Sequence, residues 1–473
     1  MNKRIELLAP AGNLEKAKIA LIYGADAVYV GGKSFSLRAR ASNFEIDDIK
    51  ELCTFAHSLN KRVYVTTNII PHDDDLKNLD EYLLALKDAK VDAIITSSLA
   101  IMLRAKELVP SIERHVSTQM SISNHEIIKF YEKIGCTRVV LAREVNLEQM
   151  AKIKKASNLE LEVFIHGGMC SSYSGRCVLS NHLTNRDANR GGCAHSCRWN
   201  YRLFDGKHRV ENKKYFFNMG SKDLMAVKYI PNFIDLGISS LKIEGRMKSA
   251  YYLATVVGCY RKVIDLYLNK GKLTEEEIKA FETEISKAEN RLTSTGFLNK
   301  DVTINEQLYD TTAEHPTKEY IGYVLDYDEN NQIAKIEQRN YFKIGDVVEF
   351  FGPNLENTKM KIEKIIDDET GEEIAEKTIY RMVQYEIDSP SKINCYVLSL
   401  QKLIVLYSIY FCTVAVFRSF SAAFALNFPS RKRPGEEFLA QRVPAGCFRY
   451  LSDLDRFLHF TELQRGDCLC VTY

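Results

Sequence analysis

The sequence predicts an α/β protein: residues 1–270 form a closed (β/α)8 barrel of the TIM type with a cysteine-rich insertion after strand seven, and a small antiparallel β-domain follows. Two observations support the barrel. A unit of short apolar strand, polar or glycine residue and amphipathic helix recurs eight times, which suits the roughly 250 residues of that fold. The strands are rich in Val, Ile and Leu without strict alternation, as in parallel strands buried on both faces. An open doubly wound sheet is the alternative.

The order of the predicted elements follows from these patterns. The expected strands are Ile5–Ala9, Ala27–Gly31, Val63–Thr67, Ala93–Thr96, His115–Gln119, Val139–Arg143, Leu161–His166 and Leu241–Glu244. Between them, Asn13 is placed to cap a helix that begins at Leu14. Asn124 is placed to cap another helix that runs to Ile134, where Gly135 ends it.

One connection is much longer than the others. About 55 residues separate His166 from a helix predicted at Lys222–Ile234, and we assign residues 167–220 to the insertion. Connections of this length in a compact domain are usually functional or disordered. Because it leaves the carboxyl end of strand seven, the insertion is expected at the face where barrels build their active sites.

The remainder of the chain divides into three parts. Residues 271–316 form a helical connection, with a charged helix expected at Thr274–Leu292. Residues 317–400 contain short alternating segments such as IGYVLDY, QIAKIEQ and KINCYVLSL, which predict a small β-barrel. Its role is either to pack on the barrel or a partner, or to contact RNA.

Residues 401–473 form an anomalous tail that is not expected to belong to the rest of the fold. Lys outnumbers Arg by 36 to 19 in residues 1–400, whereas Arg outnumbers Lys by 7 to 2 afterwards. The apolar stretch Leu403–Phe417 is short for a membrane span. We interpret the tail as a foreign extension, such as read-through or out-of-frame sequence, with an interfacial anchor as the alternative.

Composition narrows the function classes. Hydrophobic residues make up 45% and charged residues 27% of the chain, as in ordinary globular proteins. A net charge of +2 argues against wholesale coating of nucleic acid but is compatible with a local basic patch. No signal-peptide-like apolar run follows the first residues, so we expect a cytoplasmic protein with no membrane contact. Clustered cysteines there are metal ligands or catalysts rather than disulfides.

The insertion contains such a cluster. Cys170, Cys177, Cys193 and Cys197 follow the spacing C-x6-C-x15-C-x3-C. Four thiolates from one loop can hold a [4Fe–4S] cluster or a zinc ion. The wide first pair favours iron–sulfur, because zinc sites usually pair cysteines two to four residues apart. Both metals remain open on spacing alone, beside the interpretation as four unrelated thiols.

The segment EVFIHGGMCSSYSGRCVLS (162–180) resembles the signature of the collagenase-like peptidases, the thirty-second peptidase family of unknown catalytic type. ELLAPAG, AVYVGG, HVSTQM, GGCAHSCRW and LKIEGRMKS also resemble this family, over about residues 4–400. Gly168 departs from the pattern, which usually has Ser or Ala there. The resemblance implies a [4Fe–4S] cluster on Cys170, Cys177, Cys193 and Cys197.

The resemblance also implies an activity. The members with the most similar layout convert the wobble uridine of tRNA to 5-hydroxyuridine, and prephenate is the co-substrate it suggests. The implied partners are the tRNA anticodon loop and a homologous subunit. Related members hydroxylate a ribosomal RNA cytidine or support quinone hydroxylation, and the peptidase label comes from reports of collagenase activity.

Residues at the carboxyl ends of the predicted strands are the catalytic candidates. They are Asn68, Gln119, Arg143, His166, Glu244 and Arg246. His166 either reaches substrate or supports the cluster ligands, or it is a structural histidine. Glu244 and Arg246 either face substrate or form an ion pair. Arg143 is placed to clamp a carboxylate such as that of prephenate, unless Glu144 simply neutralises it.

The insertion is also locally basic. We expect RNA contacts from cationic and aromatic side chains, which suit single-stranded RNA, and the alternative is an ordinary solvated loop. These candidates are Arg176, Arg186, Arg190, Arg198 and Trp199.

Our leading hypothesis is therefore an iron–sulfur barrel enzyme of tRNA hydroxylation. A peptidase is the second, although no GxSxG or HExxH motif is present and the further cysteines nearby favour ligation over a Cys170–His166 pair. An iron–sulfur accessory subunit for another hydroxylation is the third.

Overall fold

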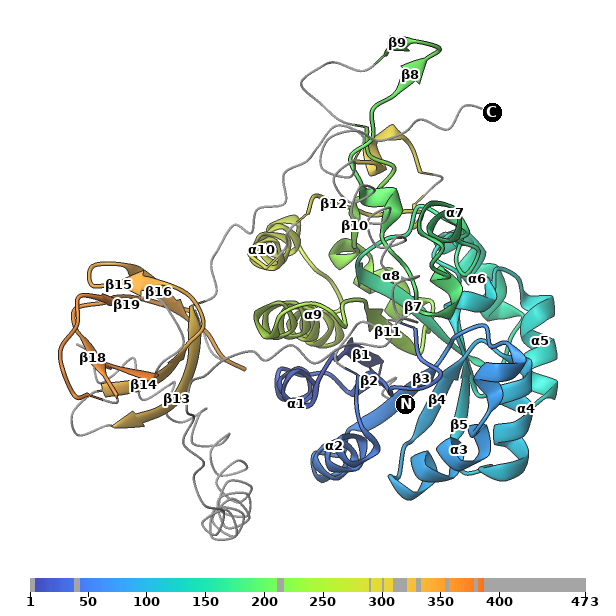
Figure 1. Cartoon of the computed structure of the whole chain (residues 1–473), viewed down its shortest axis with the longest axis horizontal. Helices are drawn as coiled ribbons and strands as arrows, with labels where there is room; N and C mark the ends of the chain where they lie inside the picture. Colours follow the sequence, from blue (N-terminus) through green and yellow to red (C-terminus); the bar gives the residue numbers. More distant parts are fainter. Residues whose placement is uncertain are drawn as a thin grey trace, which may run out of the picture.

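The computed structural model describes residues 5–37, 43–210, 217–288, 291–299, 302–308, 321–328, 333–353, 357–368, 370–377 and 382–386. The strand predicted at KINCYVLSL and the tail 401–473 lie outside these residues. Within the described chain, eight parallel strands pair in the order β1 to β7 and then β11, and β11 pairs with both β7 and β1. The sheet is therefore closed, which confirms the (β/α)8 barrel and excludes the open sheet (Figure 1).

The barrel strands begin and end close to the predicted positions. They are β1 (Glu6–Pro10), β2 (Ala27–Gly31), β3 (Arg62–Thr67), β4 (Ala93–Thr96), β5 (Glu113–Val116), β6 (Arg138–Val140), β7 (Glu160–Gly167) and β11 (Ser240–Ile243). The helices around them are α1 (Leu14–Ile22), α2 (Ile46–Ser58), α3 (Leu79–Asp88), α4 (Leu99–Leu108), α5 (His125–Lys133), α6 (Leu147–Lys155), α8 (Ile230–Asp235) and α9 (Ala250–Lys270). Helix α10 (Glu275–Ser286) packs on α9.

Side-chain caps start several of these helices as the sequence indicates. Asn13 Oδ1 accepts a hydrogen bond from Lys16 N at 2.9 Å, and Asn124 Oδ1 accepts one from Ile127 N at 3.1 Å. Each cap satisfies a backbone N–H that has no partner within the helix. Gly135 follows the second helix with φ +86°, a left-handed conformation that costs glycine little.

Several predicted elements differ in detail, and the charged helix expected at Thr274–Leu292 already ends at Ser286. Strands β5 and β6 end at Val116 and Val140, so Gln119 and Arg143 lie in the loops beyond them. The helix predicted at Lys222–Ile234 is instead a strand, β10 (Asp223–Met225), followed by the short helix α8. Strand β10 pairs antiparallel with the end of β7 and parallel with β12 (Thr293–Ser294), because the insertion returns beside the strand it left.

The barrel interior contains both apolar and charged side chains. Leu8, Tyr29, Tyr64 and Ile95 form a buried cluster inside the strands. Below them, towards the amino ends of the strands, the hydroxyl of Tyr64 donates to Glu6 at 2.6 Å. The larger hydrophobic core lies between the strands and the surrounding helices. The interior is therefore filled, as expected for an eight-stranded barrel.

A second core belongs to the C-terminal β-domain. Its strands are β13 (Gly322–Asp328), β14 (Ile333–Gln338), β15 (Phe342–Lys343), β16 (Val347–Phe350), β17 (Thr358–Lys361), β18 (Ile365–Asp367), β19 (Glu376–Lys377) and β20 (Met382–Glu386). They form antiparallel sheets that lie beside α1, α9 and α10 in Figure 1. The Phe351 ring lies 6.1 Å from Tyr23 and 5.6 Å from Tyr251, and Lys287 pairs with Glu349 at 2.9 Å. The domain thus packs on the barrel; its contact with RNA stays a prediction.

The part of the chain that the structure describes has no helix with the length and apolarity needed to cross a membrane.

Candidate functional site

The insertion, which we call the cysteine loop (residues 168–222), leaves β7 at a sharp bend. Gly167 has φ +100°, and a Cβ there would lie 2.5 Å from the carbonyl oxygen of Glu244. Only glycine allows the end of β7 to approach the end of β11 this closely. The cysteine loop therefore starts at the carboxyl ends of the barrel strands, as the sequence predicts.

The first part of the cysteine loop is attached to the loops after β5 and β6. Gly175 has φ +75°, and a Cβ there would lie 2.0 Å from the carbonyl oxygen of Gln119. The backbone N–H and the hydroxyl of Ser174 donate to the two Glu144 oxygens at 3.0 and 2.9 Å. Glu144 thus holds the cysteine loop rather than neutralising Arg143.

The middle of the cysteine loop is attached to the segment after β3. Arg190 Nε and Nη2 reach the two Asp75 oxygens at 3.0 and 2.7 Å, a bidentate ion pair. The backbone N–H of Ile70 donates to the Asn189 carbonyl at 3.0 Å, and the Asn189 side chain donates to the Cys177 carbonyl at 2.9 Å. Arg190, predicted to contact RNA, is engaged inside the molecule.

The two ends of the cysteine loop are joined through Arg198. Its Nη2 donates to the Met169 carbonyl at 3.0 Å and lies 3.5 Å from the fully buried Asp223 carboxylate. Arg291 and Lys248 approach the same carboxylate at 3.4 and 3.9 Å. Because Arg198 follows Cys197 and Met169 precedes Cys170, this contact brings the first and last cysteines of the set together.

Of the other residues predicted to contact RNA, one is engaged within the cysteine loop and two are exposed. Arg186 donates to the Cys193 carbonyl at 3.1 Å, so its guanidinium stabilises the cysteine loop. Arg176 is exposed and its Nε donates to the Ser121 hydroxyl at 3.1 Å. The Trp199 side chain, two residues after Cys197, is 37% exposed.

The four cysteines carry free thiols. Desolvation by the surrounding chain raises the pKa of Cys170, although part of its surface reaches solvent, and the nearby Cys177 and Cys197 raise it further. No group of three or more His, Cys, Asp or Glu side chains among the described residues is arranged to hold a metal ion. A [4Fe–4S] cluster takes one thiolate at each of four separate irons, and four free thiols on a fastened loop fit that donor set.

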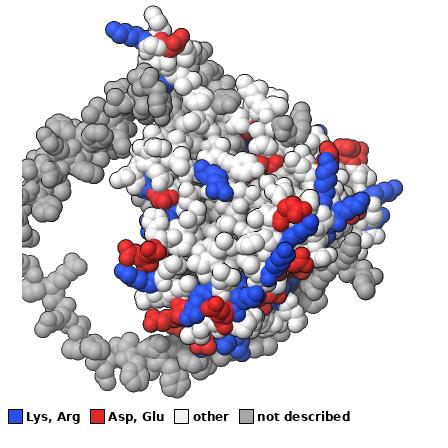
Figure 2. Space-filling model, turned by 90° about the vertical axis from the view of Figure 1, so that its right-hand side faces the viewer, with Lys and Arg blue, Asp and Glu red and all other residues white. Residues whose placement is uncertain are grey.

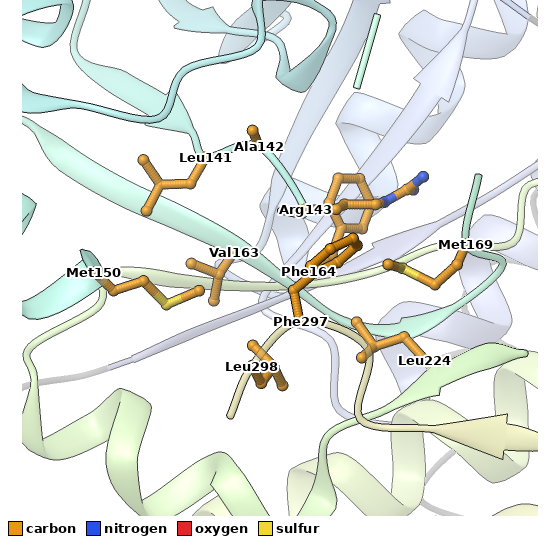
Figure 3. Close-up of a pocket in the computed structure, with 10 residues that line it drawn as sticks. All are labelled: Leu141, Ala142, Arg143, Met150, Val163, Phe164, Met169, Leu224, Phe297 and Leu298. Atoms are coloured by element: carbon orange, nitrogen blue, oxygen red, sulfur yellow. The ribbon is translucent and has the colours of Figure 1, made fainter. Parts of the chain in front are cut away.

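Arg143 lies in the loop after β6, and its charge acts on Cys170. Its Cζ lies 4.1 Å from the centre of the Phe164 ring (Figure 3), and its charge opposes the rise in the pKa of Cys170. Within the described chain its guanidinium has no carboxylate partner. The space that Arg143 lines with Phe164 and Met169 is about 10 Å³, enough for about one water molecule.

Arg246 follows β11 and Asn68 follows β3, and both side chains contact the segment after β2. Arg246 is buried and donates to Ser36 Oγ at 3.0 Å and to the Leu37 carbonyl. Asn68 Oδ1 accepts from the Leu37 backbone N–H at 3.2 Å. The Glu244 carboxylate lies near Gly168 and Arg198, because a Cβ on Gly168 would be 3.4 Å from Glu244 Oε2 and 3.6 Å from Arg198 Nη2.

His166 does not face the barrel mouth. Its ring is fully buried, its Nδ1 lies 3.2 Å from the Tyr260 hydroxyl, and it packs on Tyr252 and Tyr260 of α9. The register irregularity between Lys242 and Ile243, where β11 pairs with β7, accompanies this orientation. A thiol–imidazole pair of Cys170 and His166 is therefore not formed.

Sequence reasoning missed a buried charge network inside the barrel. Lys242 Nζ lies 2.7 Å from Glu162, whose other oxygen lies 3.1 Å from Arg138 Nη1. Burial lowers the pKa of Lys242; for Glu162 burial acts upwards, but Lys242 and Arg138 outweigh it and lower the pKa to about 2. The sequence does contain a signal for this network. Glu162 in ELEVFIHG and Lys242 in SLKIEG each lie between two apolar residues of a strand, so their side chains point to the opposite face of the sheet from those neighbours.

The sequence matches peptidase family U32 over residues 12–308 and the C-terminal domain of that family over residues 316–393. The chain belongs to peptidase family U32. The cysteine loop and the barrel mouth lie within the first match, and the strands of the β-domain lie within the second.

Relatives within this U32 family carry different names. Over 393 residues the chain is 46% identical to tRNA hydroxylation protein P1 of Bacillus subtilis, covering 82% of this chain and 93% of that protein. It is 41% identical over 269 residues to the 23S rRNA 5-hydroxycytidine C2501 synthase of Escherichia coli, covering 56% of this chain and 40% of that protein. It is 32% identical over 379 residues to a collagenase of Porphyromonas gingivalis, covering 76% of this chain and 89% of that protein.

Proposed function

We propose that this chain is a tRNA hydroxylation enzyme that converts the wobble uridine to 5-hydroxyuridine. The observation that carries the proposal is the 46% identity over 93% of the tRNA hydroxylation protein P1 of Bacillus subtilis. We place the activity in the cytoplasm, where a reduced cysteine set is expected. The uridine as target and prephenate as co-substrate come from the family resemblance and are parts of the proposal.

The cysteine loop supplies the cofactor site in this proposal. Cys170, Cys177, Cys193 and Cys197 would hold the [4Fe–4S] cluster, which supplies redox chemistry when it is bound. The chain's own residues fasten that site: Glu144 holds Ser174, Arg190 holds Asp75, and Arg198 joins Met169 to Asp223. A site held from three sides keeps its ligands in place without the cost of ordering a mobile loop.

Arg143 is the residue that would bind an acidic co-substrate. Its guanidinium has no carboxylate partner among the described residues, and it lies at the strand ends below the cysteine loop. A guanidinium binds a carboxylate through two parallel hydrogen bonds, which also orients the bound molecule. Because the space that Arg143 lines with Phe164 is only about 10 Å³, such a molecule would bind outside this space.

The decisive test is deletion of the gene followed by mass spectrometry of tRNA nucleosides. We expect 5-hydroxyuridine derivatives to disappear and to return with the wild-type gene. Cys170→Ala and Cys193→Ala should fail to restore them and should purify without iron. Cys53→Ala is the matched control, because Cys53 is also a free cysteine but lies buried on α2. Unchanged 5-hydroxyuridine in the deletion strain would refute the proposal.

A peptidase remains the second candidate because of the similarity to a collagenase of Porphyromonas gingivalis. It predicts gelatin cleavage that survives Cys170→Ala and Cys193→Ala. Full burial of His166 against Tyr260 argues against a Cys170–His166 catalytic pair.

A further inference from the structure

A small hairpin projects from the cysteine loop directly after its last cysteine. Strands β8 (Phe204–Asp205) and β9 (His208–Arg209) pair antiparallel and stand out at the top of Figures 1 and 2. Backbone hydrogen bonds of 2.8 Å in both directions between Tyr201 and Phe217 hold its base. The Tyr201 hydroxyl donates to the Ser196 carbonyl at 2.6 Å, which fixes the hairpin to the residue before Cys197.

The hairpin exposes an unusual mixture of side chains. Residues 202–210, RLFDGKHRV, carry three Lys or Arg and one Asp, a net charge of +2; Lys207 is exposed, whereas Arg202 and Arg209 are half-buried. Phe204 is 43% exposed and Val210 is 59% exposed. A Cβ placed on Gly206 at the tip would meet nothing within 4 Å. Two strands alone are marginal in water, so a projecting hairpin with exposed apolar groups suits a surface that a partner covers.

Charge and shape favour RNA as that partner. Binding of single-stranded nucleic acid combines cations that contact phosphates with aromatic rings on which bases stack. Phe204 and Trp199 supply exposed rings, and Lys207 lies at the tip beside Gly206. By contrast, on the face seen in Figure 2 the cations of the barrel are interspersed with acidic residues.

Three of the four arginines first expected to bind RNA are engaged inside the molecule, and Arg176 is the exception. Arg190 is paired with Asp75, Arg198 with Asp223 and the Met169 carbonyl, and Arg186 with the Cys193 carbonyl. These three guanidinium groups stabilise the cysteine loop. The net positive charge of residues 202–210 therefore lies on a projecting element that starts a few residues after the cysteines.

We propose that the β8–β9 hairpin, together with Trp199, is an RNA-binding finger that holds a single-stranded RNA loop next to the cysteine loop. Phe204 stacks on a base and Lys207 contacts a phosphate. The inference rests on the proposed function, since it names where the RNA of that reaction is held. It moves the RNA-binding surface from the arginines of the cysteine loop to the hairpin.

Binding of an unmodified tRNA transcript to the full chain tests the finger. Phe204→Ala should weaken binding roughly tenfold, because one stacked base contributes about that much. Lys207→Gln should reduce the slope of log affinity against log salt by about 0.7, the value for one lost phosphate contact on a single strand. Phe130→Ala and Lys133→Gln are the matched controls on α5, since Phe130 is 42% exposed and Lys133 is also exposed.

The outcomes separate this inference from the proposed function. Wild-type binding that both hairpin variants retain, with unchanged salt slopes, overturns the finger and leaves tRNA hydroxylation standing. Unchanged RNA affinity with less 5-hydroxyuridine in cells also overturns it, because the hairpin would then contact a protein. If the wild-type chain does not bind tRNA, both proposals fail. Weaker RNA binding by the hairpin variants alone, at unchanged melting temperature, supports the finger.

Discussion

The ion pair between Arg190 and Asp75 distinguishes a structural from an RNA-binding arginine. Its two parallel hydrogen bonds, at 3.0 and 2.7 Å, connect the cysteine loop to the segment after β3. The two side chains are 33% and 24% exposed, so solvent screens part of the attraction. Pairs of this kind contribute up to about 1 kcal/mol, and bidentate geometry places this one near that limit. Arg190→Asp should therefore loosen the cysteine loop by at least about that amount.

Hydrogen exchange measures this loosening directly. The Ile70 amide donates to the Asn189 carbonyl next to Arg190, so it reports local opening of the cysteine loop. A loss of about 1 kcal/mol corresponds to roughly fivefold faster exchange at that amide. Arg176→Asp is the matched control, because Arg176 lies in the same loop but is exposed and contacts only Ser121 through its side chain.

Charge reversal supplies the second half of the experiment. Combining Arg190→Asp with Asp75→Arg should restore slow exchange at Ile70, because the ion pair forms again with its ends exchanged. An arginine that binds phosphate would not be rescued in this way. The reasoning is refuted if Arg190→Asp leaves exchange at Ile70 unchanged while tRNA binding falls and the double variant does not recover it.

Three further predictions concern glycines and buried charge. Gly168→Ala should stabilise the protein by roughly 0.4–1 kcal/mol, since the added Cβ would meet nothing closer than 3.4 Å. Gly167→Ala should destabilise the protein by more than that amount, because its Cβ would lie 2.5 Å from the Glu244 carbonyl oxygen. Urea unfolding midpoints measure both effects, and equal midpoints for the two variants would contradict the geometry. Gly175→Ala should lift the cysteine loop from Gln119 and lower the iron retained on purification, and full iron content would count against this close contact. The pKa of Glu162 falls from 4.5 to about 2 on folding, so ionised Glu162 stabilises the folded protein above pH 4.5. About 3 kcal/mol of this stabilisation is lost as the pH falls to about 2. Urea titrations at different pH should show this loss for the wild type and should not show it for Glu162→Gln.

The barrel could be predicted because its signals are local and repeated. Apolar runs such as AVYVG and RVYVTT and caps such as Asn13 and Asn124 each determine one element without reference to the others. Once eight such units are counted, closure of the sheet follows from their number. The short strand β10 escaped this reasoning, because its pairing with the end of β7 depends on how the cysteine loop returns.

The contacts of the candidate site could not be predicted from the sequence. Spacing and resemblance selected the cysteines, and the strand-end rule brought Arg143, Gln119 and Glu144 beside them. The same rule failed to show that His166 faces α9, since the irregular register between β7 and β11 is not readable from residue types. The role of Arg190 depends on Asp75, which is 115 positions away in the sequence.

The filled barrel restricts where a base can react. Tyr29 and Tyr64 are buried inside the strands, and Lys242 lies 2.7 Å from Glu162, so these side chains fill the barrel between its two ends. The space beside Arg143 admits about one water molecule. Enzymes that act on a base take it out of its stack and hold it by its faces and edges. In the proposed reaction the uridine is held above the carboxyl ends of the strands, against the cysteine loop, and the β8–β9 hairpin is the element that we propose presents it there.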